Sequence, residues 1–284
     1  MKKICLIALL CLIFIQVKAQ DGATFKIKFK PNYTYKSDIS VNMKLDANAT
    51  GDPDIIDKLK SSGITNPITA LLDMGFNGVM KTGSTGADNS FPLTMDYKIA
   101  KLSVSANGQE APIPPSVSEK DIKIVGSISQ DGVMSIDSAA GKKADDSTKN
   151  QMKQMMELFQ KKIQFPAKAM KPGESFTQTT PMNLPMGKNG GNINVNYSTT
   201  YKLVSISDGK AFFDVVPNFS MDFSIQKIAI NMSGTGLGKM VYSIKDNFPI
   251  SNEGNFTLKL KVTSAKVNVD ATGDIKTSST TVIN

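Results

Sequence analysis

The chain has 284 residues, with 33 basic and 25 acidic side chains and a formal net charge of +8 at pH 7. It contains no His, Trp or Arg, which excludes imidazole bases, Ser-His-Asp triads, His-ligated metals and guanidinium recognition of phosphate. The two cysteines, Cys5 and Cys11, lie in an apolar N-terminal stretch, so the rest of the chain has neither disulfides nor thiolate nucleophiles.

The N-terminus has the layout of a secretory signal peptide. Lys2 and Lys3 precede an apolar run from Ile4 to Ile15, and Val17-Lys18-Ala19 supplies short residues before a cleavage point. We therefore predict that residues 1–19 are removed, which leaves 265 residues. The mature protein is expected outside the cytoplasm, in the periplasm, on the outer envelope or in the medium.

The mature chain, residues 20–284, is only mildly basic. Loss of Lys2, Lys3 and Lys18 lowers the formal charge from +8 to +5. The remaining lysines are scattered along the sequence, so no nucleic-acid partner is predicted, and no later stretch is apolar enough for a transmembrane helix. A short membrane anchor and a lipoprotein acylated at Cys11 are alternatives. The short apolar run and the large residue before that cysteine argue against them.

Strand periodicity begins directly after the signal. From Phe25 to Ala49, apolar residues occupy mainly the odd positions and polar residues the even ones, with an interruption at Pro31. The alternating aromatic and basic residues of Phe25–Lys30 favour a protected edge strand. This pattern is typical of antiparallel sheets that bury one face.

Helical signals follow the first strands. Asp52-Pro53-Asp54 is a typical helix start and Gly63 a typical end. Asn66-Pro67 predicts a second short helix that carries Leu71 and Leu72. A clearer helix is predicted from Ser147 to Ile163, because its apolar residues form one stripe. The residues of this stripe are Met152, Met155, Met156, Phe159 and Ile163.

The second half of the chain returns to period-two alternation, over residues 193–203, 211–225 and 256–262. Turn signals separate the predicted strands, at Asn107-Gly108, Asp131-Gly132, Asp208-Gly209 and Glu253-Gly254. We expect ten to twelve mostly sequential antiparallel strands, by the usual spacing of turn signals.

The predicted fold is mainly β (α+β): a large curved antiparallel sheet or half-barrel of meandering strands, with a few helices packed on its concave face. The small and polar residues near 139–147 divide the mature region into two possible halves, and a sheet shared across that division is equally compatible. Outer-membrane barrels have the same alternation, but the predicted helices and the absence of Trp argue against one.

A glycine-rich segment is the most informative part of the sequence. Between Ile228 and Ile244 the even positions are apolar, and three successive ones are Gly234, Gly236 and Gly238. On a strand they would clear a patch without side chains. The structural interpretation is curvature, or direct packing of the Met-rich helix; the functional one is a ligand site. The predicted ligand-binding residues are Met152, Met155, Phe159, Phe213, Met221, Phe223, Met232, Gly234, Gly236, Gly238 and Met240.

The segments that resemble catalytic or cofactor-binding motifs do not have the residue spacing that these motifs require. Residues 234–240 superficially resemble a phosphate-binding loop, but no Ser or Thr follows Lys239. Asp52, Asp54 and Asp57 do not match a calcium loop. We therefore predict no metal site, no cofactor and no catalytic residue. A hydrolase that uses carboxylates or lysine is kept as the last alternative.

One phrase resembles a known family. The segment Phe165-Pro166-Ala167-Lys168-Ala169-Met170-Lys171-Pro172-Gly173-Glu174-Ser175-Phe176 is similar to a phrase in a family of exported, β-rich bacterial proteins of unknown function, where Trp commonly replaces Phe176. The resemblance covers roughly residues 150 to 265. It implies a meander of strands and no activity. The expected architecture is also similar to that of periplasmic lipoprotein carriers.

The sequence predicts a non-enzymatic exported protein that binds a lipid, another apolar ligand or a partner segment in a curved sheet. A structural or envelope-associated protein with a filled core is the main alternative. A cavity beside the glycines would favour the first function, and dense packing there the second. The oligomeric state is left open.

Overall fold

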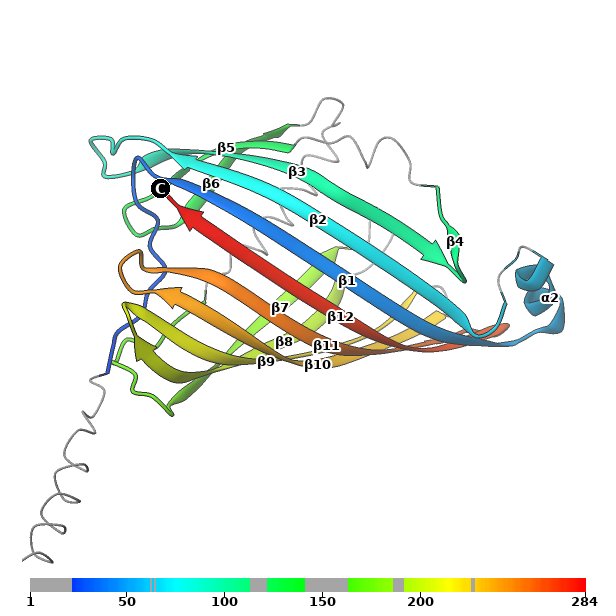
Figure 1. Cartoon of the computed structure of the whole chain (residues 1–284). Coiled ribbons are helices and arrows are strands. Elements are labelled where there is room, and N and C mark those ends of the chain that lie inside the picture. The colour runs from blue at the N-terminus through cyan, green and yellow to red at the C-terminus, as the bar shows by residue number, and fades with distance from the viewer. Residues whose placement is uncertain are drawn as a thin grey trace, which may run out of the picture.

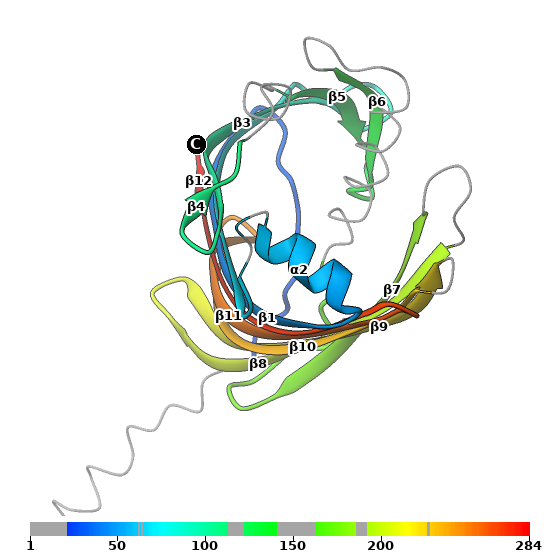
Figure 2. The same ribbon diagram turned by 90° about the vertical axis from the view of Figure 1, so that its right-hand side faces the viewer.

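The fold is one large, open antiparallel sheet (Figures 1 and 2). The computed structural model describes residues 22–61, 63, 65–112, 122–140, 163–185, 192–225 and 228–284. The predicted signal peptide and the predicted helix over 147–163, apart from its last residue, lie outside these ranges. The expectation of a large curved antiparallel sheet is confirmed.

Twelve strands form the sheet in the spatial order β6-β5-β3-β2-β1-β12-β11-β10-β9-β8-β7, with β4 paired to β3. Their bounds are β1 Thr34–Gly51, β2 Ile68–Thr82, β3 Phe91–Ala106, β4 Gln109–Glu110, β5 Ile122–Ile128, β6 Met134–Ala140, β7 Ser175–Pro185, β8 Asn192–Ser207, β9 Lys210–Ile225, β10 Ile228–Ser243, β11 Phe248–Thr263 and β12 Val267–Ile283.

The first and last long strands join the two halves of the chain. β1 pairs with β12 from Tyr35 opposite Ile283 to Gly51 opposite Val267. The sheet therefore crosses the division near residues 139–147, and β6 and β7 form its two edges on either side of the gap (Figure 2). Since the two edges are not paired, the sheet is curved but not closed.

The two faces of the sheet differ in polarity. Along β10 the even positions are apolar or glycine, while the odd positions include Asn231, Ser233 and Lys239. The registers carry this alternation across the sheet, because paired residues share a face. Phe25 and Phe29 pack on the apolar side, and their segment runs inside the curve of the sheet in Figure 2, so the apolar side is the concave one. Packing of apolar residues on this side explains why period two dominates the sequence.

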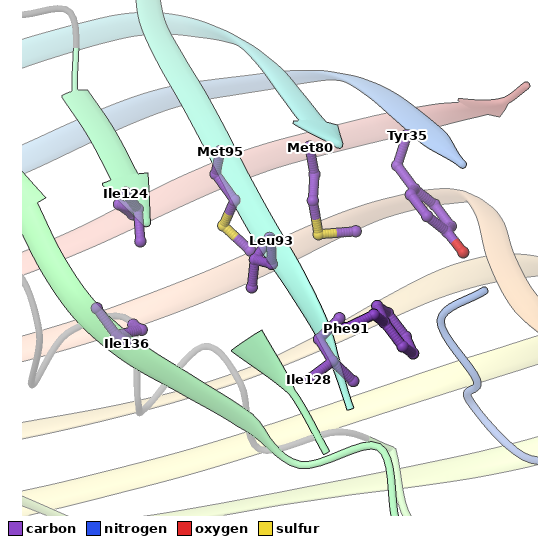
Figure 3. Close-up of a cluster of buried hydrophobic side chains, with 8 residues drawn as sticks. All are labelled: Tyr35, Met80, Phe91, Leu93, Met95, Ile124, Ile128 and Ile136. Atoms are coloured by element: carbon purple, nitrogen blue, oxygen red, sulfur yellow. The ribbon is translucent and has the colours of Figure 1, made fainter. Parts of the chain in front are cut away.

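Two apolar clusters fill the concave side at the end of the sheet where the chain ends (Figure 1). Figure 3 shows the first cluster, in which β1, β2, β3, β5 and β6 contribute Tyr35, Met80, Phe91, Leu93, Met95, Ile124, Ile128 and Ile136. The second lies on β8, β9 and β10 and consists of Phe25, Met170, Leu203, Ala211, Phe213, Met240 and Tyr242.

The segment of residues 22–33 connects the two clusters. Phe25 belongs to the second cluster, and Phe29 packs against the first with ring contacts to Tyr35 and Phe248 at 5.5 and 5.3 Å between centroids. This segment is irregular rather than a strand, apart from one bridge between Ala23 and Met170. The predicted edge strand over Phe25–Lys30 is therefore wrong, because its aromatic residues cross the end of the sheet instead of pairing along it.

The described helix, α2 (Pro53–Ser61), begins as the sequence predicts. The Asp54 amide donates to the Asp52 side chain at 3.0 Å, and Gly63 adopts a φ of +80° behind the helix. α2 lies beyond one end of the sheet, at the right of Figure 1. Within the described ranges, no helix has the length and apolarity needed to cross a membrane.

Two local predictions are wrong. The helix expected after Asn66-Pro67 is part of β2, where Leu72 faces inward and Leu71 faces outward in a period of two. The turn expected at Glu253-Gly254 lies within β11, where Gly254 pairs with Gly238. The three other turn signals each precede or connect strands, as at Asp208-Gly209, where both residues have positive φ.

Candidate functional site

The candidate site is the part of the concave face that the two clusters leave uncovered, toward the end where α2 lies. Most of its large side chains are half-buried, although Leu258, Ala47, Ala49 and Ala271 on the same face are buried. They come from β1, β2, β3, β9, β10, β11 and β12: Val41, Met43, Leu45, Leu72, Met74, Phe76, Leu102, Val104, Phe219, Met221, Phe223, Ile230, Met232, Phe256, Leu260, Val262, Val269 and Ile275. This surface is continuous across paired strands.

Charged side chains do not occur on this face in the described strands; the lysines and carboxylates of these strands occupy the opposite parity. Its polar members are hydroxyl, amide and phenol groups. Ser37 and Thr281, for example, lie 2.9 Å apart and bond to each other. Such a face offers apolar contact and weak hydrogen bonding, and it lacks a charge for an ionic headgroup.

The polarity of the faces also bears on contact with lipid. A sheet whose outer side contacts the bilayer core carries apolar residues on that side. Here the outer side carries polar and charged residues, as Asp214, Lys239 and Glu253 show on three neighbouring strands. In the described strands, the outer side of the sheet is therefore polar and the concave side apolar.

Two of the predicted ligand-binding residues lie in the filled core. Phe213 and Met240 are paired across β9 and β10, and each is only 1% exposed in the second cluster. The segment of residues 22–33 covers them from the concave side, since the Phe25 ring lies 5.2 Å from that of Phe213. They are therefore not accessible to a ligand, and their prediction as binding residues is corrected.

Three other predicted residues do lie together on the half-buried part of the concave face. Met221 is paired with Met232, and Phe223 with Ile230, on β9 and β10. The helical residues Met152, Met155 and Phe159 lie outside the described residues. Sequence periodicity therefore found part of one wall of the candidate site.

The three glycines share the concave face as predicted, but they do not leave it bare. A Cβ on Gly234 would lie 2.3 Å from the ring of Phe219, and one on Gly236 would lie 2.8 Å from the ring of Phe256. Each of these rings belongs to the residue directly opposite the glycine. The predicted patch without side chains is therefore wrong, because aromatic rings from neighbouring strands fill it.

Gly238 has a different neighbour. Its Cβ would lie 2.6 Å from the carbonyl oxygen of Glu253, so the backbones approach closely there. Gly78 on β2 repeats the aromatic arrangement, with the Tyr97 ring 2.8 Å from the position of a Cβ. The sequence analysis missed this pair because one glycine in a strand has no distinctive spacing. These contacts support the interpretation of the glycines as sites of curvature and close packing.

An ion pair fixes the segment of residues 22–33 beside the clusters. Lys30 Nζ lies 2.9 Å from the Asp246 carboxylate, and the Lys30 amide donates to the Tyr35 hydroxyl at 2.8 Å. The hydrogen bond to Asp246 raises the pKa of Lys30, although partial burial opposes it. Burial also tends to raise the pKa of Asp246, but its hydrogen bonds with Lys30 and Ser243 lower it overall.

Titratable groups near the concave face are neutral phenols. Burial raises the pKa of Tyr201 to about 12, and the nearby Tyr197 acts in the same direction. Tyr201 also stacks on Phe176, with 5.0 Å between ring centroids and 16° between planes. None of the described carboxylates is buried, and no three of them gather as a metal ion requires.

Two hollows lie on the outer, polar side of the sheet. One of about 780 Å³ crosses β8 to β12 and β1, with Asp222, Lys261 and Asp270 among its walls. The other, of about 770 Å³, includes Lys202 and Asp214, which are paired across β8 and β9. Opposite charges face each other across neighbouring strands in these walls, which stabilises a sheet without favouring a ligand of either sign.

Comparison with known proteins assigns no family. No family model matches the chain. No curated protein matches it either. Among solved structures, the outer membrane protease OmpT from Escherichia coli is similar at 8% identity with a TM-score of 0.22, covering 92% of this chain and 100% of that one. OccK11 (OpdR) from Pseudomonas aeruginosa is similar at 6% identity with a TM-score of 0.20, covering 91% and 100%. Likenesses this low carry no argument about fold or function.

Proposed function

We propose that the protein is an exported, non-enzymatic binding protein that holds an apolar molecule or chain on the concave face of its sheet. The observation that carries this proposal is the set of half-buried apolar side chains on seven strands, next to clusters in which equivalent side chains are fully buried. Burying apolar surface contributes roughly 25 cal/mol per Å², so an occupant of this face would bind by the hydrophobic effect.

The chemistry of the face defines the occupant. Its lining includes Met43, Met74, Met221 and Met232, whose flexible side chains adapt to irregular apolar shapes. Because the face lacks charged side chains in the described strands, an acyl chain or a neutral apolar group fits it better than an ion. An ionic headgroup would lie at the rim, where water remains available.

A structural role without a ligand is the competing function. The rings of Phe219 and Phe256 over Gly234 and Gly236 favour it, because they fill what would otherwise be free space. In that case the half-buried residues would serve to stiffen a curved sheet in the envelope. The two functions differ in whether an added lipid binds at all.

Native mass spectrometry of the mature protein from its exported fraction distinguishes them. We expect an added mass that organic extraction removes and that returns when a lipid extract is supplied. A bare mass in both conditions would refute ligand binding and leave the structural role.

Two matched variants locate the site. Met232→Asn places a polar group on the concave face, whereas Leu237→Asn does so on the outer face of the same strand, where Leu237 is 71% exposed. We expect the first variant to weaken ligand retention at least about tenfold and the second to leave it unchanged. Equal retention by both folded variants would place any ligand elsewhere.

A further inference from the structure

We propose that the cluster-filled end of the protein carries a cationic surface that docks on anionic lipid. This surface, called here the lysine end, lies over the second apolar cluster. It is built from residues 22–30, residues 163–174, residues 208–210 after β8, and residues 244–247 after β10. It is distinct from the concave face, so its test does not depend on ligand binding there.

Hydrogen bonds of the backbone and of the Tyr242 side chain bring these segments together. The Tyr242 hydroxyl bonds to the carbonyl and the amide of Lys26, at 2.5 and 3.3 Å. The Lys28 amide donates to the Asn247 carbonyl at 3.0 Å, and the Ile244 amide donates to the Gly209 carbonyl at 2.9 Å. Both turns lie at the left of Figure 1, next to the N-terminal segment.

The bridge between Ala23 and Met170 adds the fourth segment. It places Lys171 beside residues 22–30, and the Lys171 side chain lies 3.2 Å from the position of a Cβ on Gly22. Segments that are 147 residues apart in the chain, counted from Ala23 to Met170, thus form one surface.

Positive charge is concentrated on the lysine end. Seven lysines belong to it: Lys26, Lys28, Lys30, Lys168, Lys171, Lys210 and Lys245. Three carboxylates belong to it: Glu174, Asp208 and Asp246. The net charge of +4 is close to the +5 expected for the whole mature chain. The neighbouring half of the same end, over the first cluster, carries Asp88 and Asp131 beside Lys81 and is not cationic.

Most of these lysines are available to a partner. All except Lys30 are exposed. Two of the seven form ion pairs, Lys30 with Asp246 at 2.9 Å and Lys168 with Glu174 at 3.7 Å. Among the described residues, no carboxylate forms an ion pair with the other five. The surface therefore holds exposed ammonium groups in excess of its carboxylates, although Lys171 and Lys245 also interact electrostatically with Glu174 and Asp246.

An anionic bilayer fits this surface better than an acidic protein does. Lysine is a flexible point charge without the planar fork that fixes one carboxylate or phosphate in place, so it suits a surface of mobile headgroups. The aromatic residues beneath, such as Phe25 and Phe165, are used in the cluster rather than exposed for insertion. The docking is therefore electrostatic, peripheral and reversed by salt.

Co-sedimentation of the mature protein with lipid vesicles tests the proposal. We expect binding to vesicles of phosphatidylcholine and phosphatidylglycerol in equal parts, release by high salt, and no binding to phosphatidylcholine alone. Replacing Lys26, Lys28, Lys210 and Lys245 by Gln should lower the partition coefficient about a hundredfold or more, because each such lysine contributes roughly fivefold.

A charge-matched control separates this surface from general attraction. Replacing four exposed lysines of the strands, Lys98, Lys259, Lys261 and Lys276, by Gln gives the same net charge and should change binding less than about threefold. Each lies seven or more residues along its strand from the end of the sheet that carries the lysine end, which at the rise of a strand is roughly 20 Å or more and exceeds the Debye length. If the first variant melts differently from the parent, the Lys26/Lys28 and Lys210/Lys245 pairs are tested separately. Equal losses in both quadruple variants, absence of vesicle binding, or binding to acidic polypeptide or nucleic acid instead would overturn the proposal.

Discussion

The N-terminal segment should contribute strongly to stability through one side chain. Phe25 is 5% exposed, and its ring lies 5.4 Å from Phe165, 5.2 Å from Phe213 and 5.3 Å from Tyr242 between centroids. Phe25→Ala removes these contacts and leaves a cavity, which costs about 3–5 kcal/mol. In a protein of this size we expect the melting temperature to fall by roughly 10 °C.

Denaturant unfolding followed by circular dichroism measures this loss. Lys28→Ala is the matched control, because the exposed Lys28 side chain lies on the same segment and should change the free energy of unfolding by less than about 0.5 kcal/mol. If Phe25→Ala were as stable as Lys28→Ala, residues 22–33 would not cross the end of the sheet in solution. The described connection between the two clusters would then be refuted.

Three further predictions concern single contacts. Gly234→Ala should destabilise the fold by about 1–3 kcal/mol, because its Cβ would lie 2.3 Å from the Phe219 ring. In a double-mutant cycle measured by denaturant unfolding, adding Phe219→Leu should recover part of this loss. Asp246→Asn should cost about 1 kcal/mol at neutral pH and progressively less as the pH falls below the ordinary range of an aspartate. The lowered pKa of Asp246 beside Lys30 gives stability that is lost as pH falls through that pKa, and denaturant unfolding across acidic pH checks this. Tyr201→Phe should reduce the loss of stability above about pH 10, because burial raises the pKa of Tyr201 to about 12 and the phenol therefore ionises first in the unfolded chain. Denaturant unfolding at several alkaline pH values measures this effect, and identical profiles for the variant and the parent would contradict the burial of Tyr201.

Strand periodicity made the sheet predictable, because one face of nearly every strand is buried and the other is wet. The inward residues Met221, Met232 and Phe223 follow directly from that alternation. Its limit is that alternation places a residue on a face without showing what covers it. Phe213 and Met240 have the same pattern as Met221 and Met232, yet residues 22–33 bury only the former pair.

Residue types typical of turns were likewise not sufficient to predict where the chain turns. Asp208-Gly209 and Glu253-Gly254 are equivalent signals in sequence, but only the first has positive φ values, of 50° and 70°. Gly254 instead pairs with Gly238 in the interior of the sheet. The difference depends on the partner strand, which is a non-local property. The same holds for the aromatic rings over Gly234 and Gly236, since no spacing within β10 identifies the opposing residues.

The two halves of the chain are joined by contacts that residues near its N-terminus and C-terminus make. Tyr35 pairs with the last strand at Ile283, and Phe25 completes a cluster otherwise built from residues beyond 160. Such distant contacts form late in folding, because the loop between them must close first. A chain that leaves the cytoplasm N-terminus first, as residues 1–19 predict, cannot complete the Phe25 cluster until Tyr242 has crossed, and cannot pair β1 with β12 until Ile283 has crossed. Export in an unfolded state and completion of the sheet outside the cytoplasm are therefore mutually consistent, since the strand that unites the halves is the last to emerge.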